Sequence, residues 1–287
     1  MSRIKVIECP RDAMQGVKKW IPTKNKISYI QSLLNVGFDV LDVGSFVSKR
    51  SIPQMKDSRM VLESLNLSST TSKLLYIVAN LRGALEACVY PEIDFLGFPF
   101  SVSENFQMRN TNKTINQSLE ELKKIISVCN SNDKEVVVYL SMGFGNPYGD
   151  EWNYEVLEKW ISVIKSIGVK TISISDTIGV ANPKNIDIVF KNSIKKFHDI
   201  EFGAHFHTKP SDWFEKIDSA YKAGCRRFDT SIQGYGGCPM AADELTGNFP
   251  TEKLITYMNQ IKVNININSL NFESSYNETT KFFSDYN

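Results

Sequence analysis

The sequence of 287 residues has few cysteines, and its five cysteines are scattered and form no Cys-x-x-Cys pair. This pattern argues against a disulfide framework and a structural zinc site, and it is typical of a reducing compartment. No apolar run is long enough to cross a bilayer. No signal or transit peptide precedes the first apolar run, so we expect a cytoplasmic protein.

The chain also lacks an excess of positive or negative charge. The formal net charge is +1, so we expect neither a nucleic acid nor a membrane surface as partner. Hydrophobic residues make up 42% and charged residues 23% of the chain, which is ordinary for a globular protein. These proportions favour an enzyme or a binding protein.

What the sequence does contain is a regular alternation. Short β-branched or apolar runs are each followed by a longer stretch with apolar residues three and four positions apart, and several stretches stop at a glycine. Strand, helix, glycine and strand is the order of βα units in a parallel sheet. The sequence predicts eight strands, at residues 4–7, 38–43, 74–78, 93–97, 135–140, 171–175, 201–207 and 226–232.

Eight such units predict a (β/α)8 TIM barrel in the α/β class, with an active site at the C-terminal ends of the strands. A doubly wound sheet is the alternative, and it is disfavoured because no Gly-rich phosphate loop follows the first strand. No Pro/Gly/Ser-rich linker divides the chain, so we predict a single catalytic domain over residues 1–287. The polar, Asn/Ser-rich tail from about residue 268 is expected to be a loosely packed closing segment.

Two of the three histidines, His205 and His207, lie one residue apart. In a strand such positions face the same way, roughly 6–7 Å apart along the backbone, so both imidazoles can reach one cation if other ligands converge. The alternative is a pair of polar side chains on the face of a surface strand. We favour the cation site because other ligands follow the predicted strand ends.

Those strand ends meet at one mouth in a parallel barrel. Asp12 is the natural carboxylate ligand beside the two imidazoles, and Arg11 offers a fixed positive charge for a developing oxyanion. The alternative is that Arg11 and Asp12 form a salt bridge with each other in a loop and have no further role. An imidazole and oxygen ligand set suits Mg²⁺ or Mn²⁺, with zinc also possible.

Three further residues are candidates for proton transfer. Asp42 and Asp176 follow the second and sixth strands, where general acid–base or substrate-orienting work competes with ion pairing to lysine or arginine. Cys238 lies in a loop with three glycines within five residues. Its thiol is interpreted as a proton-transfer group, and the alternative is a buried, inert cysteine.

Seven short motifs occur in a fixed order along the chain. They are Pro10-Arg11-Asp12-Ala13-Met14-Gln15, Ser45-Phe46-Val47-Ser48, Pro53-Gln54-Met55, Asp176-Thr177-Ile178-Gly179-Val180, His205-Phe206-His207, Gly236-Gly237-Cys238-Pro239 and Gly247-Asn248. From Ile4 to about Ile261 the chain resembles the 3-hydroxy-3-methylglutaryl-CoA lyase family, in particular its bacterial members. That family lies within a wider group of metal-dependent barrel lyases and Claisen-type synthases.

The resemblance implies cleavage of 3-hydroxy-3-methylglutaryl-CoA to acetoacetate and acetyl-CoA, as in leucine degradation and ketone-body metabolism. An acyl-CoA substrate, a divalent cation and a homodimer are implied with it. The implied metal ligands are Asp12, His205, His207 and Asn248. The implied catalytic residues are Arg11 for the enolate oxygen, Cys238 for a proton and Asp176 near the substrate hydroxyl. Asp42 stays a further catalytic candidate from its position at the end of the second strand. The implied polar groups around the acyl portion are Gln15, Ser45, Ser173 and Thr177.

The chain departs from the family pattern at two acids. Asp42 stands where the family usually has glutamate, and Thr208 stands where an acid commonly follows the second histidine. Two other functions therefore stay open: Claisen condensation of acetyl-CoA with a 2-oxo acid, and cleavage of a related 3-hydroxyacyl-CoA. A third alternative is a catalytically silent barrel that binds a metal or an acyl-CoA.

Overall fold

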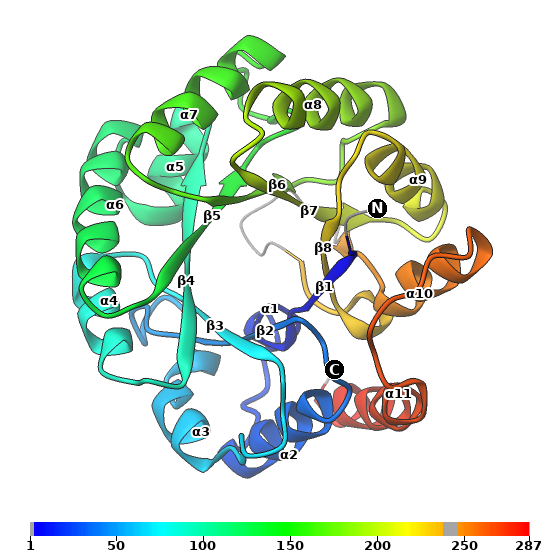
Figure 1. The fold of residues 1–287 in the computed structure, drawn as a ribbon. Helices are drawn as coiled ribbons and strands as arrows, with labels where there is room; N and C mark the ends of the chain where they lie inside the picture. Colours follow the sequence, from blue (N-terminus) through cyan, green and yellow to red (C-terminus); the bar gives the residue numbers. More distant parts are fainter. Residues whose placement is uncertain (1–2, 238–245, 287) are drawn as a thin grey trace.

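The computed structural model describes residues 3–237 and 246–286, and its centre is a closed ring of eight parallel strands (Figure 1). Each strand pairs in parallel with the next one along the chain, and β8 pairs with β1 to close the ring. This arrangement confirms the (β/α)8 barrel, because a doubly wound sheet would leave open edges. The strands are β1 (Lys5–Glu8), β2 (Val40–Ser45), β3 (Lys73–Ile77), β4 (Ile93–Ser101), β5 (Glu135–Ser141), β6 (Thr171–Asp176), β7 (Glu201–Thr208) and β8 (Arg227–Thr230).

Helices surround the ring and cover its outer face (Figure 1). Among the described residues, no helix combines the length and the apolar character that a membrane span requires. The longer elements are α2 (Thr23–Leu34), α3 (Ser58–Ser64), α4 (Leu81–Cys88), α5 (Glu104–Thr111), α6 (Ile115–Asn130), α7 (Tyr154–Ser166), α8 (Pro183–Lys196), α9 (Trp213–Lys222), α10 (Thr251–Gln260) and α11 (Ser269–Ser284). The short ones are α1 (Pro10–Gln15), two 3-10 turns, η1 (Pro53–Met55) and η2 (Ile232–Gly234), and a two-residue strand, β9 (Gly247–Asn248).

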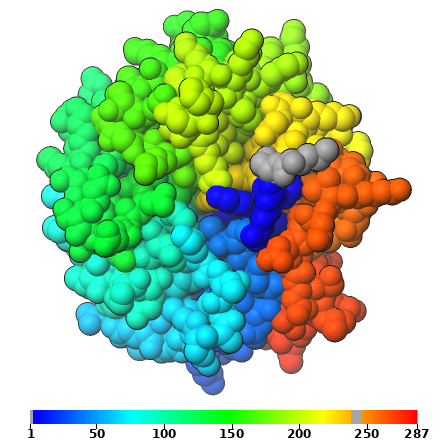
Figure 2. All heavy atoms as spheres, in the orientation of Figure 1, coloured from blue at the N-terminus to red at the C-terminus, as the bar shows by residue number. Residues whose placement is uncertain are grey.

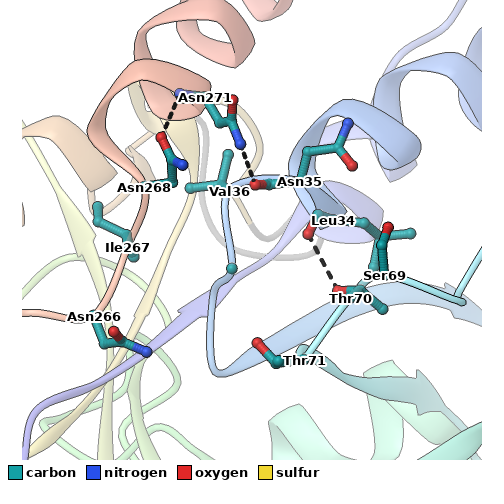
Figure 3. Close-up of a pocket in the computed structure, with 11 residues that line it drawn as sticks. Leu34, Asn35, Val36, Ser69, Thr70, Thr71, Asn266, Ile267, Asn268 and Asn271 are labelled. Atoms are coloured by element: carbon teal, nitrogen blue, oxygen red, sulfur yellow. Dashed lines mark hydrogen bonds between the residues drawn. The ribbon is translucent and has the colours of Figure 1, made fainter.

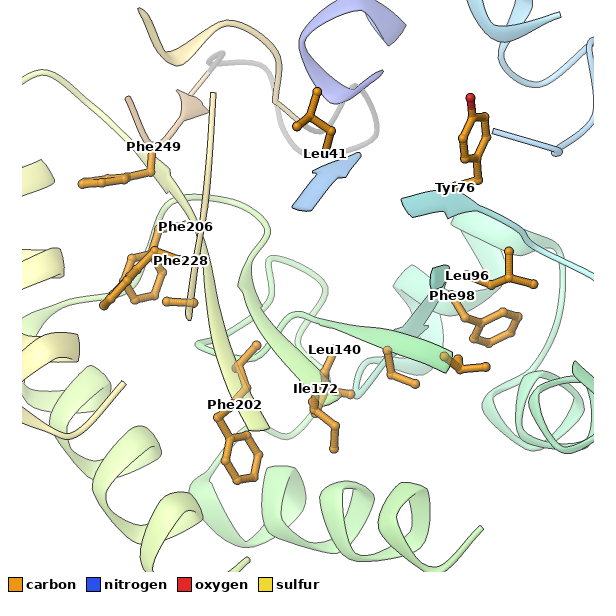
Figure 4. Packing of buried hydrophobic residues seen from close by; sticks show 14 of the residues in the cluster. Leu41, Tyr76, Leu96, Phe98, Leu140, Ile172, Phe202, Phe206, Phe228 and Phe249 are labelled. Atoms are coloured by element: carbon orange, nitrogen blue, oxygen red, sulfur yellow. The ribbon is translucent and has the colours of Figure 1, made fainter. Parts of the chain in front are cut away.

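The main hydrophobic core lies between the strands and this ring of helices. Alternate residues of each strand point outward into it, as Phe202, Phe206 and Phe228 do in Figure 4. On the helices, apolar side chains at three- and four-residue spacing complete the layer, as in α6 with Leu122, Ile125 and other buried residues.

The inward-facing residues divide the barrel interior into two halves. The half formed by β1 to β5 is largely apolar, with residues such as Ile7, Leu75 and Val137 packed together. In the half formed by β6 to β8, the inward positions carry polar or charged residues. They are Ser173 and Ser175 on β6, His205 on β7, and Arg227 and Asp229 on β8.

Barrel closure brings the two ends of the chain together. The blue N-terminal residues lie beside the orange segment of the C-terminal part of the chain (Figure 2). The register pairs Lys5 with Arg227 and Glu8 with Thr230. This pairing places the segment after β1, which begins α1, beside the ends of β7 and β8.

The C-terminal tail is not loosely packed. It forms α11, which lies against α2, where the Phe282 ring stacks on Tyr29 at 4.5 Å between centroids. Its Asn and Ser residues, which suggested a loose segment, make helix-specific hydrogen bonds. Asn268 caps the first turn, and Ser275 Oγ donates to the Ser32 carbonyl at 3.0 Å.

A buried carboxyl group, Glu8, ties the last residue of β1 to η2 and α10. Its Oε1 accepts a hydrogen bond from the Ile232 backbone N–H at 2.8 Å, and its Oε2 lies 2.6 Å from Thr251 Oγ1. Burial raises the pKa of Glu8 to about 8, because the charged form loses its water. The neutral acid can donate its proton to Thr251 while it accepts from Ile232.

We predict that Glu8→Gln changes how stability depends on pH. Between the unfolded value of 4.5 and about 8, unfolding of the native protein releases a proton from Glu8, so its free energy of unfolding falls as pH rises. Glutamine keeps both hydrogen bonds and does not titrate, so the variant gains stability relative to the native protein across this window. Urea unfolding at a series of pH values measures the difference, and parallel curves for the two proteins would contradict the prediction.

Candidate active site

Three potential cation ligands meet at the C-terminal end of the barrel. Asp12 on α1 and His205 and His207 on β7 have ligand atoms that all lie within 4.8 Å of one another. The two imidazoles share a face because strand residues two apart point the same way. Pro10 begins α1 directly after β1 and thereby turns Asp12 toward them. The structure therefore brings together the three residues around which the sequence predicts a cation site.

Each imidazole is oriented by a partner of its Nδ1 atom. His207 Nδ1 donates to the Thr177 carbonyl at 2.8 Å, and His205 Nδ1 lies 3.2 Å from Asp229 Oδ2. A carbonyl oxygen only accepts, so the Nδ1 of His207 carries the proton and its Nε2 lone pair is free to bind a cation. Such partners fix the ring orientation of metal-binding histidines.

The charges around this group give Asp12 and His207 the protonation states that a cation needs, whereas His205 must lose a proton before it can bind one. Burial and the neighbouring His205 lower the pKa of His207 to about 4, so its imidazole is neutral. Burial acts to raise the pKa of Asp12, but Arg11 and the two histidines outweigh it, and the pKa falls. Burial acts to lower the pKa of His205, but the hydrogen bond and the charge of Asp229 outweigh burial, and the pKa rises.

Asn248 reaches the same place from β9, which pairs antiparallel with β7 and sets Asn248 opposite His207. Its Nδ2 donates to Asp12 Oδ2 at 2.6 Å and to the Tyr235 carbonyl at 2.9 Å. Both amide hydrogens are then used, which leaves the Oδ1 atom as an acceptor or cation ligand. Asn248, the fourth of the predicted ligands, is therefore in contact with Asp12, the first.

Arg11 lies beside the three ligands in a fixed position. Its Nη1 donates to Asp12 Oδ1 and to Gln15 Oε1, both at 2.8 Å, while Nε and Nη2 donate to Asp42. Burial raises the pKa of Asp42 to about 6, although the Arg11 charge opposes the shift. Asp42 has no exposed surface, so its contacts correspond to the ion-pair alternative for this residue.

A cavity of about 380 Å³ opens over these groups. Arg11, Gln15 and Thr177 line it, together with both histidines and Asp12. Apolar residues of the neighbouring strands and loops also line the cavity, among them Val47, Ile52, Ile77 and Pro99. Its lining further includes the polar residues Asn80, Asn110 and Lys113.

A second hollow, of about 580 Å³, lies at the opposite end of the barrel, where α2 leads into β2 (Figure 3). Its lining includes Asn35, Thr70, Asn266 and Asn271, and contains no acid, base, thiol or imidazole. The larger hollow therefore lacks the groups that acid–base or cation chemistry requires. The smaller cavity at the C-terminal ends of the strands is the candidate active site.

Asp176 does not face this cavity. Its Oδ1 accepts hydrogen bonds from the backbone N–H groups of Val180 and Ala181, and its Oδ2 accepts from Lys216 Nζ at 2.9 Å. Burial raises its pKa, and Lys216 opposes that shift. Lys216 also donates to the His207 carbonyl at 2.8 Å. Asp176 therefore holds the end of β6 against α9 and β7, and its implied role near the substrate hydroxyl stays a prediction.

Two predicted substrate-binding hydroxyls also make internal contacts. Ser173 Oγ donates to Asp229 Oδ2 at 2.6 Å inside the barrel, where Ser173 has no exposed surface. Ser45 Oγ donates to the Ile77 carbonyl at 3.2 Å and accepts from the Val47 N–H. Their hydroxyl groups are engaged with the protein itself. Cys238 lies outside the described residues.

The sequence prediction missed Asp229 and Lys216. Asp229 lies opposite His205 in the register of β7 and β8. An acid in the middle of the predicted strand at residues 226–232 was the available signal, because a buried carboxylate in a strand needs a partner. Lys216 gave no such signal, because a lysine in an amphipathic helix is usually exposed.

Comparisons with known proteins agree with this geometry. The family model described as HMGL-like matches residues 4–277. Hydroxymethylglutaryl-CoA lyase of Bacillus subtilis is 29% identical over 90% of this chain and 85% of its own length. The cytoplasmic 3-hydroxy-3-methylglutaryl-CoA lyase of Rattus norvegicus is 29% identical over 92% of this chain and 76% of its length.

Two solved structures share the fold over almost the whole chain. A crystal structure of the HMG-CoA lyase of Bacillus subtilis superposes with a TM-score of 0.91 at 27% identity, covering 99% of this chain and 95% of that one. An HMG-CoA lyase of Acinetobacter baumannii, in complex with coenzyme A and 3-methylmalate, gives a TM-score of 0.90 at 26% identity, covering 98% and 92%.

We predict that Asp229→Asn weakens divalent-cation binding by about tenfold, because His205 loses the charge that orients its ring. Titration of the folded protein with Mn²⁺, followed by isothermal calorimetry, measures the affinity. Asp199→Asn is the matched control, since it removes the same charge from an exposed position. Equal affinities in the two variants would contradict the role given to Asp229.

Proposed function

Because the chain belongs to the HMGL-like family, we propose that it is a carbon–carbon lyase that cleaves 3-hydroxy-3-methylglutaryl-CoA to acetoacetate and acetyl-CoA. The observation that carries this proposal is the meeting of Asp12, His205 and His207 at the floor of a cavity that Arg11 also lines. Breaking the bond between C2 and C3 requires a base that accepts the hydroxyl proton and a place for negative charge. Asp42, whose pKa is about 6, stays the predicted acceptor of that proton, and Arg11 offers the positive charge.

The donor set fits a divalent cation. One anionic carboxylate, two imidazoles with Nδ1 occupied, and one amide oxygen make a set of nitrogen and oxygen ligands without thiolate. Such a set suits Mg²⁺ or Mn²⁺, and Asp12, His205, His207 and Asn248 would hold the ion. When bound, a divalent cation lowers the pKa of a hydroxyl group that it contacts.

Arg11 is the residue that we assign to the developing enolate. When the C2–C3 bond breaks, its electron pair passes to C2 and is shared with the thioester oxygen, while C3 becomes the ketone of acetoacetate. Asp42 and Asp12 hold the Arg11 guanidinium before substrate arrives, so no reorganisation is needed as the charge forms. A proton must then add to C2, and Cys238 as its donor stays a prediction from the resemblance.

The substrate-binding assignment divides in two. Gln15 and Thr177 line the cavity and can contact the acyl portion directly. Ser45 and Ser173 act through the protein, by fixing the end of β2 and the carboxylate of Asp229. A relative with coenzyme A and 3-methylmalate bound supports an acyl-CoA substrate here.

A related 3-hydroxyacyl-CoA is the second candidate substrate. A relative in Pseudomonas aeruginosa, 28% identical over 92% of this chain, is named a 3-hydroxy-3-isohexenylglutaryl-CoA/hydroxymethylglutaryl-CoA lyase. The apolar lining residues Val47, Ile77 and Pro99 are compatible with an alkyl group at C3. Comparing kcat/KM for substrates with methyl and longer C3 groups decides between the two.

Four further expectations stay predictions: a single domain, a cytoplasmic location, a homodimer, and the absence of nucleic-acid and membrane partners. Sedimentation velocity on the purified chain tests the homodimer, and fractionation of the source cells tests the location.

We predict that cleavage depends on a divalent cation. The purified protein should release acetoacetate from 3-hydroxy-3-methylglutaryl-CoA, lose this activity in EDTA, and regain it with Mg²⁺ or Mn²⁺. Coupled reduction of acetoacetate measures the release. A sample that instead condenses acetyl-CoA with a 2-oxo acid would support the synthase alternative, and cation binding without turnover of either substrate pair would support the silent barrel.

We predict that Arg11→Ala lowers kcat by at least about a hundredfold, because the enolate loses its fixed counter-charge. Removing Arg11 also leaves Asp42 buried without its partner, so an Arg11→Met/Asp42→Asn double variant tests the role without that penalty. Arg59→Ala, on the exposed face of α3, is the control for loss of an arginine. Near-native turnover by a folded Arg11 variant would refute the assignment.

A further inference from the structure

The C-terminal helix contacts the segment that orients Asn248, although α11 contributes no residue to the cavity. We propose that α11 is a positioning element of the cation site, acting through Phe283 and Tyr235 on the amide of Asn248. This inference rests on the cation site of the proposed function. It adds residues more than 30 positions beyond Asn248 to the machinery of that site.

The first step is the orientation of the Asn248 amide. The Tyr235 carbonyl accepts from Nδ2 at 2.9 Å, and Asp12 Oδ2 accepts from the same nitrogen at 2.6 Å. Both partners are acceptors, so they select the amide rotamer whose nitrogen faces them. The position of the Tyr235 backbone therefore decides where the Oδ1 atom points.

The second step is what holds Tyr235. Its ring stacks on Phe283 with 4.0 Å between centroids and 20° between planes, and Phe283 has no exposed surface. The neighbouring Gln233 donates from Nε2 to Thr280 Oγ1 and to the Tyr276 carbonyl. The turn before Tyr235 thus has two attachments to α11, one aromatic and one polar.

The third step is that this turn needs external support. Gln233 has φ of 59°, a left-handed conformation that non-glycine residues seldom adopt without tertiary contacts. Directly after Tyr235, the backbone at Gly236 comes so close to the site that a Cβ there would lie 2.6 Å from Asn248 Nδ2. A small shift of the turn would therefore move the side-chain amide of Asn248.

The contacts of α11 provide a matched pair of variants. Phe282 and Phe283 both pack on Tyr29 of α2, with ring centroids 4.5 and 5.8 Å away, but only Phe283 stacks on Tyr235. Phe283→Leu and Phe282→Leu each remove one ring from the contact between α11 and α2. Thr280→Val removes the hydroxyl that faces Gln233 from an exposed position, so it tests the polar attachment with little effect on folding.

Mn²⁺ alone is the probe, with its affinity for the full chain measured by electron paramagnetic resonance and folding checked by thermal unfolding. We expect Phe283→Leu and Thr280→Val to weaken Mn²⁺ binding by about tenfold and Phe282→Leu to leave it unchanged. In an Asn248→Ala background, Phe283→Leu should cause no further loss, because its effect passes through that amide.

Native Mn²⁺ affinity in folded Phe283→Leu and Thr280→Val would overturn the proposal, as would an equal loss of affinity with and without Asn248. Turnover of 3-hydroxy-3-methylglutaryl-CoA by the unmodified chain is measured on the same preparation. If that chain turns over its substrate while the variants keep full Mn²⁺ affinity, only the role of α11 fails. If it neither binds Mn²⁺ nor turns over substrate, the proposed function fails as well.

Discussion

Closure of the barrel by the β1–β8 pairing is the constraint on which the site depends. Asp12 and the two histidines are separated by more than 190 residues, and only the parallel register between Lys5–Glu8 and Arg227–Thr230 brings α1 to the end of β7. An open sheet would leave β1 and β8 as edges, and the ligands would have no common centre. The chemistry of the site is therefore a property of the whole ring rather than of any one βα unit.

The buried charges near the mouth form a connected set. Arg11 bridges Asp12 and Asp42, while Asp229 orients His205 and Lys216 joins Asp176 to the end of β7. Each would be costly to bury alone, since an unpaired charge loses its hydration without compensation. Their mutual contacts keep the guanidinium and imidazoles in fixed positions before any ligand binds, which is the arrangement that electrostatic catalysis requires.

The sequence predicted all eight strands and the meeting of Asp12 with the two histidines, because strand alternation and the common mouth of a parallel barrel are regular features. The sequence alone left open which way the side chains at each strand end face. In β6, Ser173 and Ser175 face inward, so Asp176 at the next position faces outward and meets Lys216 of α9. The same alternation places Ser173 inside the barrel, but below the cavity, at the level of Asp229.

The tail shows a different limit of sequence reasoning. Its Asn, Ser and Thr residues have modest helix propensity, and no strong apolar repeat marks α11. Its stability comes instead from tertiary contacts of a few rings with Tyr29 and Tyr235, which lie far away in the sequence. Such contacts become visible only once the barrel has placed α2 and the turn after β8 side by side.

The divided interior gives the barrel floor an uneven electrostatic environment. Beneath the imidazoles, the Ser173 hydroxyl and the charges of Asp229 and Arg227 interact electrostatically with a nearby ion while they stay in place. Beneath the opposite wall, the tightly packed aliphatic side chains of Ile7, Leu75 and Val137 cannot interact in this way. The barrel interior beneath the cavity is thus polar on the side of the imidazoles and apolar on the other, which favours one orientation for a molecule that has both a charged and a hydrocarbon part.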